Sequence, residues 1–452
     1  MNKSLLSVIV SGAMLCGASV YAQDEAERVT FKTSDGFYFV VNDDEPASVS
    51  LLPVSDGYQG DVVTVPSAAT DPSTGITYTV TTIGEQAFYY SRCQKVVYPA
   101  TITKIDGSAL FNSSVADVEI ADGNETYVSV DGIVYTKDMT TLWSFPPEHK
   151  YDGYVLPETV TAIGDYAFCG LFYLSSFEIP ARVKSIGEAA FMGTRLKNIV
   201  IPSTVESVGS AAFQNCKQLV SIEFPEGMTL MPDHVLTYCS KLESVNLPSS
   251  LTKIGGYAFN GAFIYGKTYG FKCVDEITVP DEVTEIEYGA FQGNRGLVSV
   301  TLGKKVSNIG LFAFAQCSAL KSLTSLNTVP PVCEELDQAA TGVEDAFAEV
   351  PEDCVLYVPA ESVDAYKAAW GVKFTDIRPI DSAGIEDAGI ESGFFEVNVA
   401  GGVLTVVASG AVEVYNCAGV KVASSHDGRV AASLPAGVYI VRGAGRVAKV
   451  AL

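Results

Sequence analysis

Three histidines are the first residues to consider for catalysis, because histidine is the most common general acid or base in enzymes and a frequent metal ligand. His149 lies in a predicted hairpin, His234 stands in a degenerate copy of a repeat, and His426 lies in a predicted turn. No two of them have a spacing typical of zinc ligands. We therefore interpret each as a surface or core residue, and we predict no catalytic residue, no cofactor and no metal.

Paired carboxylates are the other source of chemistry, because a glycoside hydrolase needs only two acidic side chains. The chain has 53 aspartates and glutamates, and Glu178 and Glu223 fall at exposed positions of predicted strands. We interpret them as part of a solvated acidic stripe on a binding surface, and a carboxylate-based hydrolase is the least favoured alternative. The sequence holds no G-x-S-x-G, no H-E-x-x-H and no phosphate-binding loop that would support another enzyme class.

The elements that must position these side chains come from a repeat. The repeated block has six positions: an aliphatic residue, a residue that is usually glycine, two variable residues, alanine and phenylalanine. Most neighbouring copies are 22 or 23 residues apart. That interval lies within the range of about 20 to 29 residues typical of leucine-rich repeats. The block is too short for a stable free helix, so we expect a tight helical turn whose phenylalanine fills the core. The copies span residues 83–88, 163–168, 186–191, 208–213, 254–259, 286–291 and 309–314, with degenerate copies at 105–110 and 231–236.

Each block is followed by the pattern Leu-x-x-aliphatic-x-aliphatic-Pro, which predicts a short strand. Alternate residues point inward, and proline ends the strand because it cannot donate to a sheet ladder. One coil cannot bury its own apolar edge, so coils must stack on one another at about 4.8 Å per step. We therefore predict a right-handed leucine-rich repeat solenoid with stacked parallel β-strands and short helical turns. The strand patterns occupy residues 174–180, 196–202, 219–225 and 242–248.

The cysteines follow the same period. Cys216, Cys239 and Cys317 each lie three residues after the phenylalanine position and three before the leucine position, so they form one internal column. We favour the interpretation that they are small buried residues at a tight bend. A disulfide between adjacent coils is the alternative.

The repeats resemble the BspA-like leucine-rich repeat family of secreted bacterial surface proteins. The resemblance rests on Thr161-Ala-Ile-Gly-Asp-Tyr-Ala-Phe168 and Leu174-Ser-Ser-Phe-Glu-Ile-Pro180, and similar residues cover about 79 to 330. Ser129 to Lys137 resembles the hairpin insertion of the family, and Leu356-Tyr-Val-Pro359 with Ser362 to Ala368 resembles its closing cap. The resemblance implies adhesion or binding of host proteins, but it does not identify a partner, because the motif consists of core residues.

The two ends of the chain are organised differently. Lys3, the apolar stretch Leu5 to Val20 and Val20-Tyr21-Ala22 predict a signal peptide and its cleavage site. Lipid attachment at Cys16 is the less favoured alternative, because Leu15 stands where such a signal has a small residue. No later segment reaches the ~18 to 20 apolar residues of a membrane helix. We expect a signal peptide (1–22), an N-terminal β cap (23–78), the solenoid (79–332), its C-terminal cap with a helix from Val363 to Trp370 (333–380), a linker (381–393) and a small β-sandwich (394–452).

The sandwich is predicted from strands at Val403 to Val407, Val412 to Tyr415 and Val438 to Val441. The run Leu434-Pro-Ala-Gly-Val-Tyr-Ile-Val441 is similar to the C-terminal sorting domains of type IX secretion, which direct a cargo across the outer membrane. This similarity implies a protein that is secreted or held at the outer-membrane surface of a Gram-negative bacterium. Arg446 to Leu452 carries fewer lysines than that pattern, so a sorting signal and a simple stalk module both stay open.

Net charge narrows the choice of partner. A formal charge of −24 would repel a polyanion, and no basic stripe with interleaved aromatics is visible in the sequence, so nucleic acid is excluded as a partner. We expect an extracellular protein or glycan instead, and the oligomeric state is not predicted. The leading hypothesis is an extracellular or cell-surface binding or adhesion protein that uses the solenoid surface. A structural protein of a surface layer without a specific ligand is the second.

Two parts of the solenoid are candidate binding surfaces. Outward strand positions carry small polar residues, so a large partner could lie against a smooth sheet; they are Ser176, Asn198, Ser221, Ser244 and Ser299. The insertion at 261–273 lengthens one repeat to 32 residues and carries the aromatic residues that dominate interface hot spots. These aromatics could instead pack on their own coil. The insertion residues are Phe263, Tyr265, Tyr269 and Phe271 around Lys267.

Overall fold

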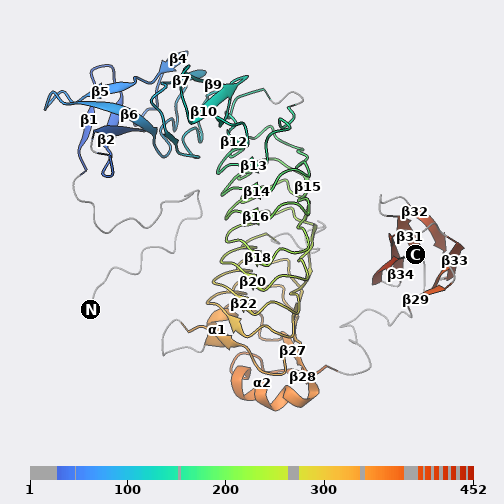
Figure 1. Cartoon of the computed structure of the whole chain (residues 1–452). Helices are drawn as coiled ribbons and strands as arrows, with labels where there is room; N and C mark the ends of the chain where they lie inside the picture. Colours follow the sequence, from blue (N-terminus) through green and yellow to red (C-terminus); the bar gives the residue numbers. More distant parts are fainter. Residues whose placement is uncertain are drawn as a thin grey trace, which may run out of the picture. The chain divides into compact units, whose positions relative to one another are not determined.

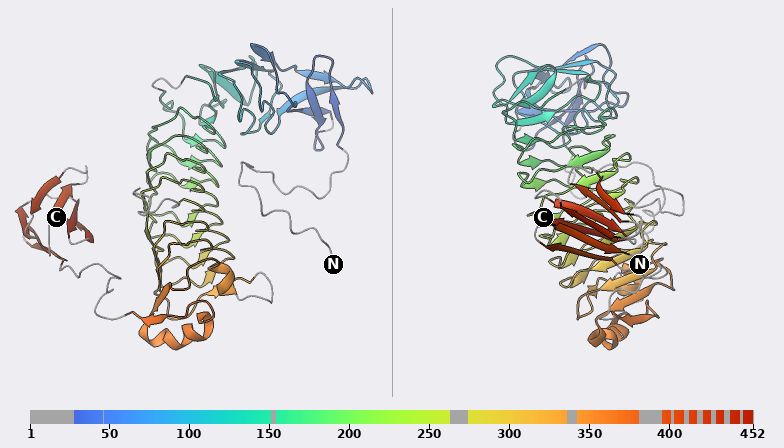
Figure 2. Two further views of the ribbon diagram at one scale, coloured as in Figure 1. Left: turned by 180° about the vertical axis from the view of Figure 1, so that it is seen from behind. Right: turned by 90° about the vertical axis from the view of Figure 1, so that its right-hand side faces the viewer.

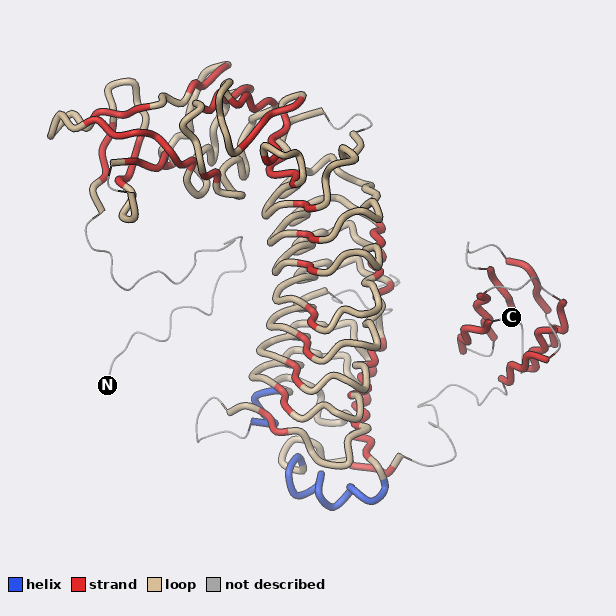
Figure 3. Tube along the Cα trace, in the orientation of Figure 1, coloured by secondary structure: helices blue, strands red, loops and turns tan. Residues whose placement is uncertain are grey.

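The computed structural model describes residues 28–45, 47–150, 154–262, 274–335 and 342–380, and the strands between 395 and 451. The chain divides into two compact units, Met1–Pro379 and Ile380–Leu452. The first is a stack of coils, as the solenoid prediction requires (Figure 1). Each coil contributes two short strands, and the strands line up in two columns along the stack (Figure 3). Strand therefore prevails over helix throughout this unit.

One column of strands lies where the Leu-x-x-aliphatic pattern predicts it. Its strands pair in parallel and in register, with Ile199 beside Ile222 and Ile222 beside Val245. Residues 174–180 are an exception, because they do not form the predicted strand: Ile179 is buried, but Phe177 is only partly buried. We call this column the long-strand sheet. Its strands are β15 (Asn198–Val200), β17 (Ser221–Glu223), β19 (Ser244–Val245), β21 (Glu276–Thr278), β23 (Ser299–Leu302), β25 (Ser322–Ser325), β27 (Val355–Val358) and β28 (Ile377–Pro379).

The second column was not predicted. It consists mainly of two-residue strands that end on the aliphatic residue of the Gly-x-x-Ala-Phe block, such as Ile163 beside Ile186. We call it the short-strand sheet, and its residues had been assigned to a turn. Its strands are β12 (Thr141–Ser144), β13 (Ala162–Ile163), β14 (Ser185–Ile186), β16 (Ser207–Val208), β18 (Leu230–Met231), β20 (Lys253–Ile254), β22 (Glu285–Ile286), β24 (Asn308–Ile309) and β26 (Val332–Cys333).

The Gly-x-x-Ala-Phe block forms a non-helical turn in place of the expected helical turn. Its second variable residue has a positive φ, for example 57° at Tyr166, which no helix accommodates. The Tyr166 and Phe168 N–H groups donate to the carbonyls of Glu188 and Ala190 in the next coil, at 2.7 and 2.8 Å. Backbone groups that a helix would satisfy internally are thus satisfied by the neighbouring coil. The turn therefore contributes to stacking in the same way as the strands.

Glycine in this block allows the coils to approach each other. A Cβ atom added to Gly209 would collide with the backbone of Gly187 and Glu188 in the preceding coil. The φ of Gly209 is not in the left-handed region, so the glycine is needed for close approach and not for an unusual backbone conformation.

The phenylalanines form the centre of the core. The rings of Phe168 and Phe191 stack with centroids 5.1 Å apart, and those of Phe191 and Phe213 with centroids 5.3 Å apart. Leu236 occupies the same position in the degenerate coil and is fully buried. The column resumes with Phe259, Phe291, Phe314 and Phe347, whose successive ring centroids are 5.1 to 5.2 Å apart. The predicted interior row of phenylalanines is therefore confirmed (Figure 2 shows the stacked coils from two further sides).

The N-terminal part is built from strands that pair with the first coils. The first three strands form an antiparallel set. The third of them, β3 (Ser48–Leu52), pairs in parallel with β6 (Thr77–Ile83), with Val49 beside Val80. The parallel ladder begins at Val62, which pairs with Lys95, ahead of the first predicted repeat. The hairpin predicted near Ser129 is present. The strands are β1 (Thr30–Lys32), β2 (Tyr38–Val41), β3 (Ser48–Leu52), β4 (Val62–Thr64), β5 (Ala68–Thr70), β6 (Thr77–Ile83), β7 (Lys95–Tyr98), β8 (Lys104–Ile105), β9 (Asp117–Ile120), β10 (Tyr127–Val130) and β11 (Ile133–Thr136).

The far end of the solenoid is closed by helix. The helix α2 (Val363–Trp370) has the predicted bounds, and α1 (Gly342–Ala346) and the 3-10 helix η2 (Ala360–Ser362) precede it. The Trp370 ring lies 5.5 Å from that of Phe347, and its indole N–H donates to the Pro331 carbonyl at 3.2 Å. This contact covers the last phenylalanine of the column.

The second unit consists of two antiparallel sheets. One contains β29 (Phe395–Ala400), β30 (Val403–Ala408) and β33 (Arg429–Ser433), in the order β29-β30-β33. The other contains β31 (Val412–Asn416), β32 (Lys421–Ser425), β34 (Val438–Gly443) and β35 (Arg446–Ala451), in the order β32-β31-β34-β35. Alternate residues of β30 and β31 are buried, namely Leu404, Val406, Val412 and Val414. Two sheets with apolar residues buried between them are typical of a sandwich.

Candidate functional site

The outward residues of β15, β17, β19, β21, β23 and β25 form a broad polar surface, which we call the sheet face. Most of its side chains are small, and Ser221 donates to the Asn198 carboxamide oxygen at 2.7 Å. Val200 is the large apolar residue of this face, with 58% of its surface exposed. Other outward residues are Ser244, Glu276, Ser299 and Ser322.

Glu223 lies on this face and Glu178 lies beside it, outside any strand; both are exposed, but they are not adjacent. The Lys197 N–H donates to the Ser175 carbonyl, which places Glu178 beside Val200, and Val200 pairs with Glu223. The two carboxylates are therefore two coil steps apart, roughly 9 to 10 Å along the stack. That separation is larger than the spacing of about 5 Å between the nucleophile and acid of a retaining glycosidase, and it lies at or beyond the upper end of the range of about 6.5 to 9.5 Å for an inverting one. Neither carboxylate takes part in an ion pair among the residues that the structure describes.

A hollow adjoins the sheet face where residues 174–180 do not form a strand. Its volume is about 700 Å³, and it brings a carboxylate, an ammonium group, hydroxyls and an amide together with apolar surface. Val155 is 78% exposed at its rim. The Tyr154 and Tyr135 hydroxyls are 2.8 Å apart, which fixes the Tyr154 ring. The lining residues are Tyr154, Val155, Ser175, Ser176, Phe177, Glu178, Lys197 and Asn198.

The hollow was only partly predictable. Strand alternation predicts that Glu178 is exposed, but it does not place Tyr154, Val155 or Lys197 at a binding site. Tyr154 and Lys197 are far apart in the sequence and meet only because their coils stack on either side of residues 174–180. The available signal was the exposed aliphatic residue before Leu156 and Pro157, where the repeat usually has a polar one.

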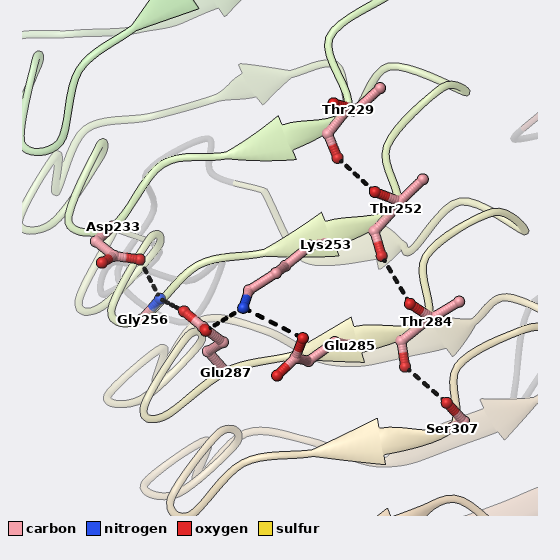
Figure 4. A network of polar contacts seen from close by, with 9 residues as sticks. All are labelled: Thr229, Asp233, Thr252, Lys253, Gly256, Thr284, Glu285, Glu287 and Ser307. Atoms are coloured by element: carbon pink, nitrogen blue, oxygen red, sulfur yellow. Dashed lines mark hydrogen bonds and ion pairs between the residues drawn. The ribbon is translucent and has the colours of Figure 1, made fainter.

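The opposite side of the coil has a different character. On the short-strand sheet, the Thr252, Thr284 and Ser307 hydroxyls donate to the carbonyls of Thr229, Thr252 and Thr284 (Figure 4). Lys253 bridges Glu285, at 3.2 Å, and Glu287. The Gly256 N–H donates to both the Asp233 and the Glu287 carboxylates, at 2.8 and 3.0 Å. Because these polar groups already bond from coil to coil, the sheet face is the better candidate for binding a partner.

Two of the three histidines lie within the described residues, and both contact neighbouring parts of the stack. His149 Nδ1 lies 2.9 Å from the Ala116 carbonyl oxygen, and His426 lies outside the described residues. The His234 ring stacks 4.9 Å from that of Tyr257, and burial there lowers the pKa of His234, an effect that Asp233 partly opposes. No group of three or more potential metal ligands occurs within the described part of the chain.

The cysteine column consists of buried hydrogen-bond donors. The thiols of Cys216, Cys239 and Cys317 donate to the carbonyls of Phe191, Phe213 and Phe291, at 3.2, 3.1 and 3.4 Å. Asn294, in the same column, donates to the Phe259 carbonyl at 2.9 Å. These three cysteines are reduced, as the interpretation as small buried residues expects, and not joined in a disulfide. Their burial raises the pKa of the Cys216 thiol to about 11 and that of Cys317 to about 12.

The aromatic residues predicted as a binding site lie outside the described residues. They are Phe263, Tyr265, Tyr269 and Phe271, which fall within 263–273 together with the predicted Lys267. The described residues on either side place the root of the insertion: the Ala262 N–H donates to the Phe259 carbonyl, and the Val274 N–H donates to the Leu242 carbonyl. The insertion therefore starts and ends at the bend between the turn and the long-strand sheet.

Solved structures that are similar to this chain include the following three. A leucine-rich repeat protein from Eubacterium ventriosum is 21% identical, with 65% of this chain and 90% of that chain covered and a TM-score of 0.39. A leucine rich cell surface protein from Faecalibacterium prausnitzii is 20% identical, with 78% and 95% covered and a TM-score of 0.40. A leucine-rich repeat protein from Bacteroides ovatus is 21% identical, with 76% and 80% covered and a TM-score of 0.34. No curated protein matches the chain.

None of the described helices is long and apolar enough to cross a membrane. The model of the BspA type leucine-rich repeat region matches six copies, in residues 72–130, 148–265 and 262–332. These residues make up more than half of the chain and coincide with the stacked coils. The chain therefore belongs to the BspA type leucine-rich repeat family.

Proposed function

We propose that this protein is an extracellular binding protein that holds a protein or a glycan against its sheet face, with the hollow as the centre of contact. The observation that carries the proposal is the contrast between the two sheets. The short-strand sheet uses its charged and hydroxyl groups to join coils, whereas Glu223 and Val200 of the long-strand sheet, and Glu178 and Val155 beside it, are exposed. Exposed apolar surface surrounded by polar groups is typical of an interaction site.

The described residues also favour binding over catalysis. Val200 separates Glu178 from Glu223, and no cluster of potential metal ligands occurs among the described residues. A leucine-rich repeat solenoid presents an extended surface that suits a large partner. We therefore propose a role without enzymatic activity.

The location of the protein is a further part of the proposal. The predicted signal peptide (1–22) supports export, and the similarity of residues 394–452 to sorting domains of type IX secretion supports display at the outer-membrane surface of a Gram-negative bacterium. Residues 23–78 and 333–380 would serve as caps of the solenoid, and 381–393 as a linker. Adhesion is the function that fits such a location. The insertion residues Phe263, Tyr265, Lys267, Tyr269 and Phe271 would form a second contact.

The experiment is a binding screen with a matched pair of variants. The chain from residue 23 onward is tested against immobilised collagen, laminin and mucin and against an array of neutral glycans. Val200→Glu places a charge on the sheet face, and Leu230→Glu places the same charge on the short-strand sheet, where Leu230 is 46% exposed. We expect Val200→Glu to weaken binding of the best probe by about tenfold, because a charge buried without a partner is costly, and Leu230→Glu to leave it unchanged.

Two results would contradict the proposal. Equal loss of binding in both variants would show that the sheet face is not the contact. An absence of binding to every probe, together with ordered self-association of the chain at high concentration, would favour the structural surface-layer alternative.

A further inference from the structure

A second surface of the solenoid has its own chemistry. After each core phenylalanine position the chain turns through a bend into the long-strand sheet, and these bends lie above one another in successive coils. We call their outer surface the basic edge. It is formed by the residues from each core position to the repeat leucine, 191–196, 213–219, 236–242, 291–297 and 314–320, and the bend of the coil between the third and fourth segments lies largely outside the described residues.

The basic edge carries no acidic residue. In a chain with 53 aspartates and glutamates against 29 lysines and arginines, every charged side chain in these five segments is positive. Arg195, Lys217 and Lys241 stand in three successive coils, and all three are exposed. Arg295 is the fourth cation, and it is exposed as well.

These cations differ from the other cations of the same coils in having no carboxylate partner. Lys184 pairs with Glu206 at 3.3 Å, Lys304 with Asp281 at 2.7 Å, and Lys305 with Glu282 at 2.7 Å. On the basic edge, by contrast, the described residues provide no ion pair, and Lys241 donates only to the neutral side chain of Gln218, at 2.8 Å. Positive charge on this edge is therefore available to a ligand.

The edge is a narrow strip between two acidic borders. On the turn side the exposed carboxylates of Asp165, Glu188 and Asp233 follow the stack, and on the sheet side those of Glu223 and Glu243 do so. At physiological salt, charges are screened beyond about 8 Å, so a ligand feels the local strip more than the net charge of −24. A ligand that fits must therefore be thin, linear and anionic.

We propose that the basic edge binds an acidic polysaccharide whose carboxylates lie along the stack of coils. Neighbouring coils are about 4.8 Å apart, so Arg195, Lys217 and Lys241 follow one another along the stack and can contact a polymer that carries its charge on repeating sugars. The guanidinium groups of Arg195 and Arg295 can bind carboxylates in the bidentate manner. Between the cations, Asn215, Gln218 and Ser240 provide amides and a hydroxyl that can bond sugar hydroxyls.

The acidic borders favour a glycan over nucleic acid. Nucleic acid has a high linear charge density, and its affinity depends on many phosphate contacts. A chain of charge −24 with carboxylates on both sides of the strip repels a nucleic-acid duplex, which has one charge per about 1.7 Å, more than a glycan with one charge per sugar. This surface is separate from the hollow, so the inference stands or fails independently of the proposed function.

The test compares two triple variants of equal charge. Arg195→Gln/Lys217→Gln/Lys241→Gln removes three cations from the basic edge, and Lys184→Gln/Lys304→Gln/Lys305→Gln removes three ion-paired cations from other parts of the same coils. Binding of the full mature chain to polygalacturonate, to single-stranded DNA of similar length and to neutral dextran is measured at low and at physiological salt. Thermal unfolding of both variants checks that they remain folded.

We expect the wild-type chain to bind polygalacturonate more tightly than DNA or dextran, and the affinity to fall as salt rises. The edge variant should bind polygalacturonate about tenfold more weakly, as three exposed charge contacts predict, and the control variant should be unchanged. Similar losses in both variants would overturn the assignment of the edge. DNA or dextran binding as tightly as polygalacturonate would overturn the assignment of the ligand, and no binding of polygalacturonate by the wild type would overturn both.

Discussion

The Phe191 and Phe213 rings lie parallel, with an angle of 1° between their planes and 5.3 Å between their centroids. Two residues 22 positions apart bury their rings fully and in the same orientation because their coils are nearly identical in shape. This relationship recurs along the column and is the clearest evidence that each coil is held by its neighbours. Contacts between coils therefore determine both the stability of the solenoid and the shape of the surface that it presents.

The phenylalanine column should dominate stability. Phe191→Ala removes a fully buried ring that contacts Phe168 and Phe213, and should lower the free energy of unfolding by about 3 to 5 kcal/mol. Urea unfolding followed by circular dichroism measures the effect. Phe172→Ala is the matched control. Because Phe172 is 55% exposed, its replacement should lower the free energy of unfolding by less than about 0.5 kcal/mol. Similar losses in the two variants would show that the column is not the core.

The block glycine should be intolerant of even one methyl group. Gly209→Ala places a Cβ against the backbone of Gly187 and Glu188, so the coils must separate, at a cost of about 1 to 3 kcal/mol. The measurement is again the midpoint of urea unfolding. Ser210→Ala changes the next residue, which is exposed, and should leave the midpoint unchanged. A Gly209→Ala variant as stable as the wild type would mean that the coils are less closely packed than we describe.

The described cysteines should be unreactive in the folded protein. Burial raises the pKa of Cys216 to about 11 and those of Cys333 and Cys354 to about 12, so almost no thiolate is present near neutral pH. A variant with Cys273→Ser and Cys417→Ser leaves only the described cysteines in the mature chain. It should react with a thiol reagent only after unfolding in urea. Rapid labelling of the folded variant would contradict the buried column.

His234 should make stability depend on pH. Burial against Tyr257 lowers its pKa in the folded state, so the unfolded chain binds the proton more readily. The contribution of neutral His234 to the free energy of unfolding is thus fully present above its pKa of about 6.5 in the unfolded chain, and it is lost as the pH falls below that value. Between pH of about 7.5 and about 5.5, the wild type should lose more stability than the His234→Gln variant. Equal losses would show that His234 does not resist protonation.

The core and the helix α2 could be predicted from the sequence because they depend on local patterns. The row of phenylalanines follows from a fixed period of apolar residues, and α2 follows from an amphipathic segment whose Tyr366 and Trp370 are buried. The short-strand sheet could not be predicted in this way, since strands such as Ala162–Ile163 have only two residues and are defined by their neighbours. The sequence also predicts a helical turn for the Gly-x-x-Ala-Phe block, because a local pattern does not reveal that the amides of the block bond to the next coil.

The candidate surfaces depend on contacts that are distant in sequence. Glu178 was identified from strand alternation alone, but Lys197 joins it in the hollow only through stacking. The cations of the basic edge occur once per coil, so the sequence shows no basic stripe, and Arg195 and Lys217 come together only in the folded chain. A surface made of one side chain from each coil is therefore the hardest kind to recognise from the sequence alone.

The most direct measurement for the proposed function is carboxylate footprinting of the mature chain with and without its best-bound probe. Carbodiimide labelling followed by mass spectrometry reports the accessibility of each acidic side chain. We predict that the bound probe protects Glu223 on the sheet face and Glu178 beside it, and leaves Glu206, whose side chain is 74% exposed on another side of the coil, labelled as before. Protection of Glu206 with full labelling of Glu178 and Glu223 would contradict binding at the sheet face.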